Sequence, residues 1–139
     1  MSHRRYVYRT FYALGIASSL IACAQQMDRP QPAAVSGPPV MVVQAAAGRI
    51  LTTPSGMAVY TFDKDTLGTS NCYDACALYW SPVLARGGEQ PTGNLSVKAR
   101  KDGTIQWAQR GMPLYTFAQD KRPGDMKGDN YESTWHVAR

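Results

Sequence analysis

The sequence is poor in the residues that most hydrolytic enzymes use for catalysis. It has 139 residues but only two histidines, and His136 is the single histidine beyond the first 22 residues. It contains no Gly-x-Ser-x-Gly turn and no His-Glu-x-x-His pair, which removes the usual signatures of serine and zinc hydrolases. The sequence therefore leans against an enzyme, and no cofactor is expected.

Long apolar runs are also scarce. The most apolar stretch, 11–22, is too short for a permanent membrane-spanning helix, which needs about 20 residues. It follows a basic start with three arginines, Arg4, Arg5 and Arg9. A basic start followed by a short apolar run is typical of an export signal, here predicted over residues 1–22.

The end of this signal, Leu20-Ile21-Ala22-Cys23, resembles the cleavage site of bacterial lipoproteins. That resemblance implies that Cys23 is acylated on its sulfur and becomes the new N-terminus, anchored in a membrane by its lipid. An ordinary secretory signal with an unrelated cysteine is the alternative. Because Ala24 rather than Asp follows the cysteine, a Gram-negative host would carry the protein to the outer membrane, facing the periplasm.

A strong excess of one charge is lacking once the signal is removed. The chain has 15 basic and 10 acidic residues, and the signal takes away three basic residues and no acidic one. The remaining net charge is +2, so the pI near 9.3 largely reflects the signal. No basic run exceeds two residues, and the sequence therefore excludes nucleic acid as a partner.

Cysteines are few, and their number suggests their roles. If Cys23 carries lipid, Cys72 and Cys76 remain as a pair in an oxidising compartment, where a disulfide is expected. The loop that it closes is short, so its stabilising effect should be modest. The alternative is that reduced Cys72 and Cys76 join His136 in an envelope copper site or act in thiol redox chemistry.

Proline is concentrated in one segment and divides the chain. Four prolines lie between residues 24 and 39, where they disfavour both helix and sheet. This composition predicts a tether over residues 23–39. The folded domain is then expected over residues 40–139.

The domain contains an internal repeat. The ten residues 56–65 return as 111–120, a shift of 55 positions, and aligning 40–83 with 95–138 gives eleven identities without a gap. Unrelated segments of that length match at roughly three positions on ordinary residue usage. The sequence therefore predicts two tandem units, 40–84 and 95–139.

The pattern of each unit predicts short strands separated by turns. Apolar residues alternate at 95–97, an Asp-Gly hairpin signal follows at 102–103, and further strands are expected at 105–107 and 113–117. A helical turn is expected only near 73–79. The predicted fold is mostly β, with two pseudo-equivalent antiparallel β-meanders that form one small domain.

The repeated segment supplies the candidate site residues. Its strand places a tyrosine and a phenylalanine on one face, and an aspartate follows where the strand ends. One interpretation is structural, with core aromatics and aspartates that accept from backbone N–H groups. The other is a shared site for a cation or polar ligand. The residues concerned are Tyr60, Phe62 and Asp65 in the first copy and Tyr115, Phe117 and Asp120 in the second.

Both copies fit the pattern Tyr-x-aromatic-x-x-Asp. Together with the site at Cys23 and the Cys72-x-x-x-Cys76 pair, this pattern resembles predicted bacterial lipoproteins with a conserved Tyr-x-(Phe/Trp/Tyr)-x-x-Asp motif, a secreted repeat of unknown function. The resemblance covers about residues 40–139. It implies a cell-envelope location and a duplication, and no reaction.

We therefore expect a membrane-anchored envelope protein that acts as a non-catalytic binding or structural module. Aromatic side chains are the candidates for a binding surface, because their rings join an apolar face to a polar edge. The expected partner is an envelope polysaccharide or an envelope protein. The candidate surface residues are Tyr73, Tyr79, Trp107 and Tyr131.

Overall fold

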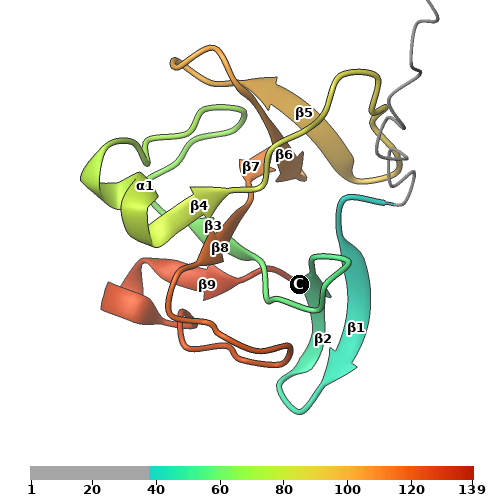
Figure 1. Cartoon of the computed structure of the whole chain (residues 1–139), viewed down its shortest axis with the longest axis vertical. Coiled ribbons are helices and arrows are strands. Elements are labelled where there is room, and N and C mark those ends of the chain that lie inside the picture. The colour runs from blue at the N-terminus through green and yellow to red at the C-terminus, as the bar shows by residue number, and fades with distance from the viewer. Residues whose placement is uncertain (1–37) are drawn as a thin grey trace, which may run out of the picture. The chain divides into compact units, whose positions relative to one another are not determined.

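A four-stranded antiparallel sheet lies at the centre of the domain, and the two repeats contribute its strands alternately. The computed structural model describes residues 38–139, which belong to one compact unit. The strand order is β4–β8–β3–β9. Figure 1 labels these four strands near the middle of the domain. The first repeat gives β3 (Tyr60–Phe62) and β4 (Trp80–Pro82), and the second gives β8 (Tyr115–Phe117) and β9 (Trp135–Val137).

The register of this sheet relates the two repeats by a pseudo-two-fold axis. Tyr60 pairs with Tyr115, its own counterpart in the other copy. On either side of that pair, Phe62 lies opposite Trp135, and Trp80 lies opposite Phe117. Each copy therefore completes the sheet of the other, and neither repeat has a central sheet of its own.

Two hairpin sheets accompany the central sheet, one from each repeat. The first joins β1 (Met41–Ala45) to β2 (Gly48–Thr52) through a two-residue turn that Gly48 closes with a φ of 97°. The second joins β5 (Leu95–Ala99), β6 (Ile105–Gln109) and β7 (Met112–Pro113). Its β5–β6 loop contains Gly103, with a φ of 82°, at the predicted Asp-Gly turn.

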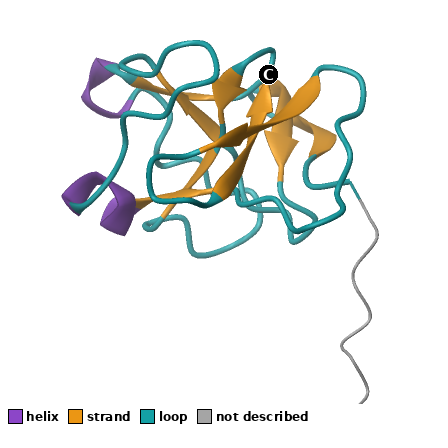
Figure 2. Ribbon diagram, turned by 90° about the horizontal axis from the view of Figure 1, so that it is seen from above, coloured by secondary structure: helices purple, strands orange, loops and turns teal. Residues whose placement is uncertain are grey.

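In the described part of the chain, helical structure is limited to two short pieces. The helix α1 (Ala75–Tyr79) lies within the expected segment 73–79, and a 3₁₀ turn η1 (Tyr131–Ser133) follows later. Figure 2 shows both pieces on the same side of the strands. Among residues 38–139, no helix is long and apolar enough to cross a membrane.

The core consists of two clusters on opposite faces of the central strands. Alternation along β3 sends Tyr60 and Phe62 to the first cluster, while the preceding Val59 lies in the second. The first cluster is mainly aromatic. The second packs Val40, Leu51, Val59, Trp107, Leu114 and Ala138.

The predicted mostly β fold with two tandem repeats is confirmed, and the helical turn predicted near 73–79 is present as α1. The sequence did not show that the repeats exchange strands or that the core has two clusters. The predicted export signal at 1–22 and the lipidation site Cys23 lie outside the described residues. The predicted tether at 23–39 does as well, except for its last two residues.

Candidate functional site

Four aromatic rings form a continuous stack across the central sheet. Trp80 and Trp135 stack on each other at 3.7 Å between centroids, with ring planes only 1° apart. Phe117 stacks on Trp80 at 4.1 Å, and Phe62 stacks on Trp135 at 4.0 Å. Rings of the two repeats thus pair in the stack, and each such contact adds about 0.5–1.5 kcal/mol beyond simple burial.

The tyrosine and aspartate of the repeated motif bond across the repeats. The Tyr60 hydroxyl donates to Asp120 Oδ2 at 2.6 Å, and the Tyr115 hydroxyl donates to Asp65 Oδ2 at 2.6 Å. The partners lie 60 and 50 positions apart in the chain. Each motif therefore supplies the donor for one bond and the acceptor for the other, and we call these the reciprocal Tyr–Asp pairs.

The second oxygen of each aspartate holds a loop. Asp65 Oδ1 accepts from the backbone N–H of Asn71 at 2.7 Å, and Asp120 Oδ1 accepts from that of Lys127 at 2.9 Å. Both aspartates are only 6% exposed. Both carboxylate oxygens of each residue thus have protein partners, an arrangement that corresponds to the structural interpretation of the motif.

Burial changes the acid–base properties of these groups. It raises the pKa of Asp65, while hydrogen bonds from Tyr115 and Asn71 and the charge of Arg100 act in the opposite direction. Burial and the bond to a carboxylate raise the pKa of both Tyr60 and Tyr115 far above its usual range. The tyrosines therefore remain protonated donors at physiological pH, which suits a structural role better than proton transfer.

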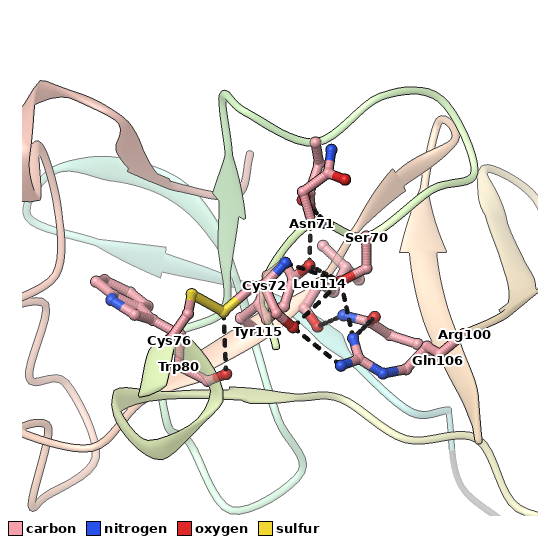
Figure 3. The surroundings of a disulfide bond; sticks show 10 residues. Ser70, Asn71, Cys72, Cys76, Trp80, Arg100, Gln106, Leu114 and Tyr115 are labelled. Atoms are coloured by element: carbon pink, nitrogen blue, oxygen red, sulfur yellow. Dashed lines mark hydrogen bonds between the residues drawn. A yellow bond between two sulfur atoms is a disulfide. The ribbon is translucent and has the colours of Figure 1, made fainter. Parts of the chain in front are cut away.

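The buried Arg100 links the loop that contains Ser70 and Cys72 to strand β6 of the second repeat. The Arg100 guanidinium donates to Ser70 Oγ at 2.9 Å, to Gln106 Oε1 at 2.6 Å and to the Cys72 carbonyl at 3.0 Å. The Ser70 hydroxyl also lies 2.7 Å from that of Tyr115 (Figure 3). This network surrounds one of the two reciprocal pairs only, because the first repeat has Ala45 at the position of Arg100.

The predicted disulfide between Cys72 and Cys76 is present. Cys72 is fully buried, and Cys76 lies at the start of α1. His136 is not part of this group, since its Nε2 lies 2.9 Å from Asp63 Oδ2. Within residues 38–139, no three His, Cys, Asp or Glu side chains are placed to hold a metal ion. His136 therefore does not form a ligand group with the two cysteines among the described residues, and the copper and thiol redox alternatives stay untested predictions.

A pocket of about 380 Å³ opens beside the aromatic stack, between α1 and η1. Trp80 and Trp135 are almost fully buried there, whereas Tyr79 and Tyr131 are 57% and 39% exposed. Five of its lining residues are aromatic, and we call it the aromatic pocket. Its lining consists of Phe62, Lys64, Ala75, Cys76, Tyr79, Trp80, Tyr131, Glu132 and Trp135.

Comparison with known proteins places the chain in a family. A family model described as a secreted repeat of unknown function matches residues 41–84 and again residues 96–139. The chain belongs to this family. The two matched segments are the halves whose strands alternate in the central sheet, and a secreted family agrees with the predicted export. No curated protein matches the chain, and no solved structure does either.

The secreted-repeat domain has strained backbone beside its aromatic pocket. Glu132 and Ser133 have φ values of 50° and 53°, a region that residues other than glycine and asparagine seldom adopt, and they follow Asn130 and Tyr131. Glu132 is one of the charged lining residues. Strain of this kind costs about 1–3 kcal/mol per residue and concentrates at functional sites. No pattern in the sequence indicated this strain, and Lys64 and Glu132 were not predicted as pocket residues.

The four aromatic residues predicted as a binding surface of the secreted-repeat domain have different positions. Tyr79 and Tyr131 line the aromatic pocket. Trp107 is only 1% exposed and belongs to the core. Tyr73 is half-buried, with the Arg100 guanidinium 4.4 Å from its ring centroid. Only two of the four thus contribute to one recognisable site.

Proposed function

We propose that this secreted-repeat protein is a lipid-anchored envelope protein whose domain is a non-catalytic binding module for envelope polysaccharide. The observation that carries the proposal is the aromatic pocket. Its volume of about 380 Å³ lies in the range of small-ligand sites, roughly 300–1,000 Å³.

The chemistry of the lining suits a sugar. One face of a pyranose ring consists of C–H groups, which pack against aromatic rings, while its hydroxyl groups need hydrogen-bond partners at the edge. Tyr79 and Tyr131 offer exposed rings with polar tips. Lys64 and Glu132 are the charged residues of the lining, and they supply a donor and an acceptor.

The pocket is held in place before any ligand arrives. Its floor is formed by the stacked indoles of Trp80 and Trp135, and one wall carries Cys76 of the disulfide. A rigid site loses little conformational entropy on binding, so that more of the contact energy remains as affinity. This supports a recognition role for the aromatic side of the domain.

Lipid anchoring at Cys23 completes the proposal. Its support is the sequence Leu20-Ile21-Ala22-Cys23 at the end of the export signal. A lipid on this cysteine would keep the domain at the membrane surface, close to the envelope polysaccharides. We expect labelled palmitate to be incorporated into the wild-type protein in its host and to be lost in Cys23→Ser. Equal labelling of both proteins would contradict the anchor.

Binding is tested by co-sedimentation of the purified protein with peptidoglycan sacculi stripped of protein. The test variant combines Tyr79→Ala and Tyr131→Ala, which removes the two partly exposed rings and replaces none of the four stacked rings, although Tyr131 packs against Trp80 at 5.7 Å and Phe117 at 5.3 Å between centroids. The matched control is Leu78→Ala, because Leu78 lies on α1, is 76% exposed and does not line the pocket.

We expect the wild type and the Leu78→Ala control to sediment with sacculi. The double variant should lose at least tenfold in affinity, since each exposed ring is an anchor for the ligand. Failure of the wild type to sediment with sacculi would refute the polysaccharide proposal. Equal sedimentation of the double variant would refute the role of the aromatic pocket.

A further inference from the structure

A second pocket, separate from the aromatic one, is lined by three arginines. Its volume is about 280 Å³, and it shares no lining residue with the aromatic pocket. We call it the arginine pocket. Its lining consists of Val42, Arg49, Ile50, Leu51, Asn94, Gln109, Arg110 and Arg139.

The positive charge of this pocket is poorly compensated. No acidic residue lines it. Arg139 reaches Asp129 at 3.6 Å, whereas Arg49 and Arg110 have no ion pair among residues 38–139. Arg49 and Arg110 are thus two unpaired like charges at a small concave site, beside the paired Arg139, and they raise the local positive potential. Such a site favours an anion that would neutralise them.

The internal repeat supplies a built-in comparison. A pocket of about 300 Å³ occurs at related positions of the first repeat. Four of its lining residues correspond, at the shift of 55, to four in the arginine pocket. The pairs are Pro39 with Asn94, Pro54 with Gln109, Ser55 with Arg110, and Leu84 with Arg139.

The corresponding pocket carries balanced charge. Its charged lining residues are Arg86 and Glu89, one of each sign. Related positions of the two repeats therefore line both pockets. Of the two, the arginine pocket alone is lined by three arginines and two side-chain amides. Packing alone does not require this difference, because the related positions hold proline, serine and leucine.

The position of Arg110 adds a further indication. It lies in the β6–β7 turn with a φ of 49°, and its backbone N–H donates to the Asn94 carbonyl at 2.8 Å. A left-handed backbone is unfavourable for arginine and is normally left to glycine or asparagine. A charged side chain at such a position is consistent with a functional constraint.

We propose that the arginine pocket binds a phosphate group of an anionic ligand. Guanidinium groups match the oxygens of a phosphate group with paired N–H donors, whether the phosphate is inorganic or part of a singly charged phosphodiester. The side-chain amides of Asn94 and Gln109 provide further donors. Both a phospholipid headgroup and a free phosphate carry this chemistry.

The test is a titration of the purified ¹⁵N-labelled protein, followed by NMR at constant ionic strength. The probes are inorganic phosphate, soluble dihexanoyl phosphatidylglycerol and, for salt effects, chloride. The test variant combines Arg49→Gln and Arg110→Gln. Arg86→Gln is the matched control, because it removes one cation from the corresponding pocket of the first repeat.

We expect saturable phosphate-induced shifts at Asn94 and Gln109, at least tenfold weaker binding in the double variant, and unchanged binding in Arg86→Gln. Tighter binding of phosphatidylglycerol than of phosphate would identify a lipid headgroup, and the reverse would identify a non-lipid phosphate. Shifts that chloride reproduces would overturn the proposal. So would a loss of binding that is equal in the double variant and in the control.

Discussion

Replacing Tyr60 with Phe removes one bond that holds the two repeats together. The ring stays, so the aromatic packing is kept, but Asp120 Oδ2 loses its donor at 2.6 Å. The Gly128 backbone N–H also loses its acceptor, the Tyr60 hydroxyl, at 3.3 Å. All three groups are buried in the native fold.

The size of the effect follows from burial and charge. A hydrogen bond to a charged group contributes about 1.5–3 kcal/mol, and a buried polar group left without a partner costs about 1–3 kcal/mol. We therefore expect Tyr60→Phe to lower the free energy of unfolding by about 2–3 kcal/mol. Urea unfolding followed by tryptophan fluorescence measures it, with Tyr131→Phe as the control for loss of a partly exposed hydroxyl.

A double-mutant cycle identifies the partner. Tyr60→Phe combined with Asp120→Asn should show a coupling energy of about 1 kcal/mol or more, because the two groups share one bond. Tyr60→Phe combined with Asp65→Asn should be additive within about 0.5 kcal/mol, although Asp65 belongs to the same motif. Coupling of Tyr60 to Asp65 in place of Asp120 would refute the exchange between repeats.

Three further predictions concern stability. Joint replacement of Cys72 and Cys76 by Ser should lower the free energy of unfolding by about 2 kcal/mol, the entropy of a short closed loop, in urea titrations; no change would contradict a stabilising disulfide. The raised pKa of Asp65 means that the folded state binds its proton more tightly than the unfolded state does. The stability of the wild type relative to Asp65→Asn should therefore increase as the pH falls from neutral towards 4, and a decrease would refute that sign. Gly128→Ala should cost about 1–3 kcal/mol, because its Cβ would lie 2.7 Å from a tryptophan ring atom, whereas Gly87→Ala meets nothing within 4 Å; equal unfolding of the two variants would argue against tight packing at Gly128.

Local patterns in the sequence predicted much of the fold. Period-two alternation and glycine turns indicated the strands, and the shift of 55 indicated the duplication. The pairing of Cys72 with Cys76 followed from the assignment of Cys23 to lipid, which leaves two cysteines, and from the oxidising compartment. The strands and turns depend on residues that are neighbours in the chain, and the duplication is found by aligning the sequence with itself. Both kinds of pattern can be read from a single sequence.

The exchange between repeats could not be predicted, because it depends on contacts about 50–60 positions apart. A tyrosine and an aspartate five positions apart suggest a local turn. Two copies of the same motif give no indication of whether Tyr60 bonds to Asp65 or to Asp120. The duplication offers one signal in retrospect, because a motif that recurs intact in both copies is what a symmetric exchange requires.

The two pockets were missed for a related reason. Lys64 and Glu132 come from different repeats and meet only after the strands have interleaved. The strained backbone around Glu132 conflicts with local propensity, and sequence patterns do not indicate such strain. In the arginine pocket, Arg49 and Arg110 are likewise isolated in the sequence and belong to different repeats.

The most direct test of the proposed function is an NMR titration of the purified ¹⁵N-labelled protein with soluble disaccharide fragments of peptidoglycan. Polysaccharide recognition predicts saturable shifts of the Trp80 and Trp135 indole N–H signals and of backbone amides near Tyr79 and Tyr131. The muramic acid of these fragments carries a carboxylate, so any shift in the arginine pocket reports that charge and is read separately from the response of the aromatic pocket. Absence of saturable shifts, or shifts confined to residues outside the aromatic pocket, would contradict the account.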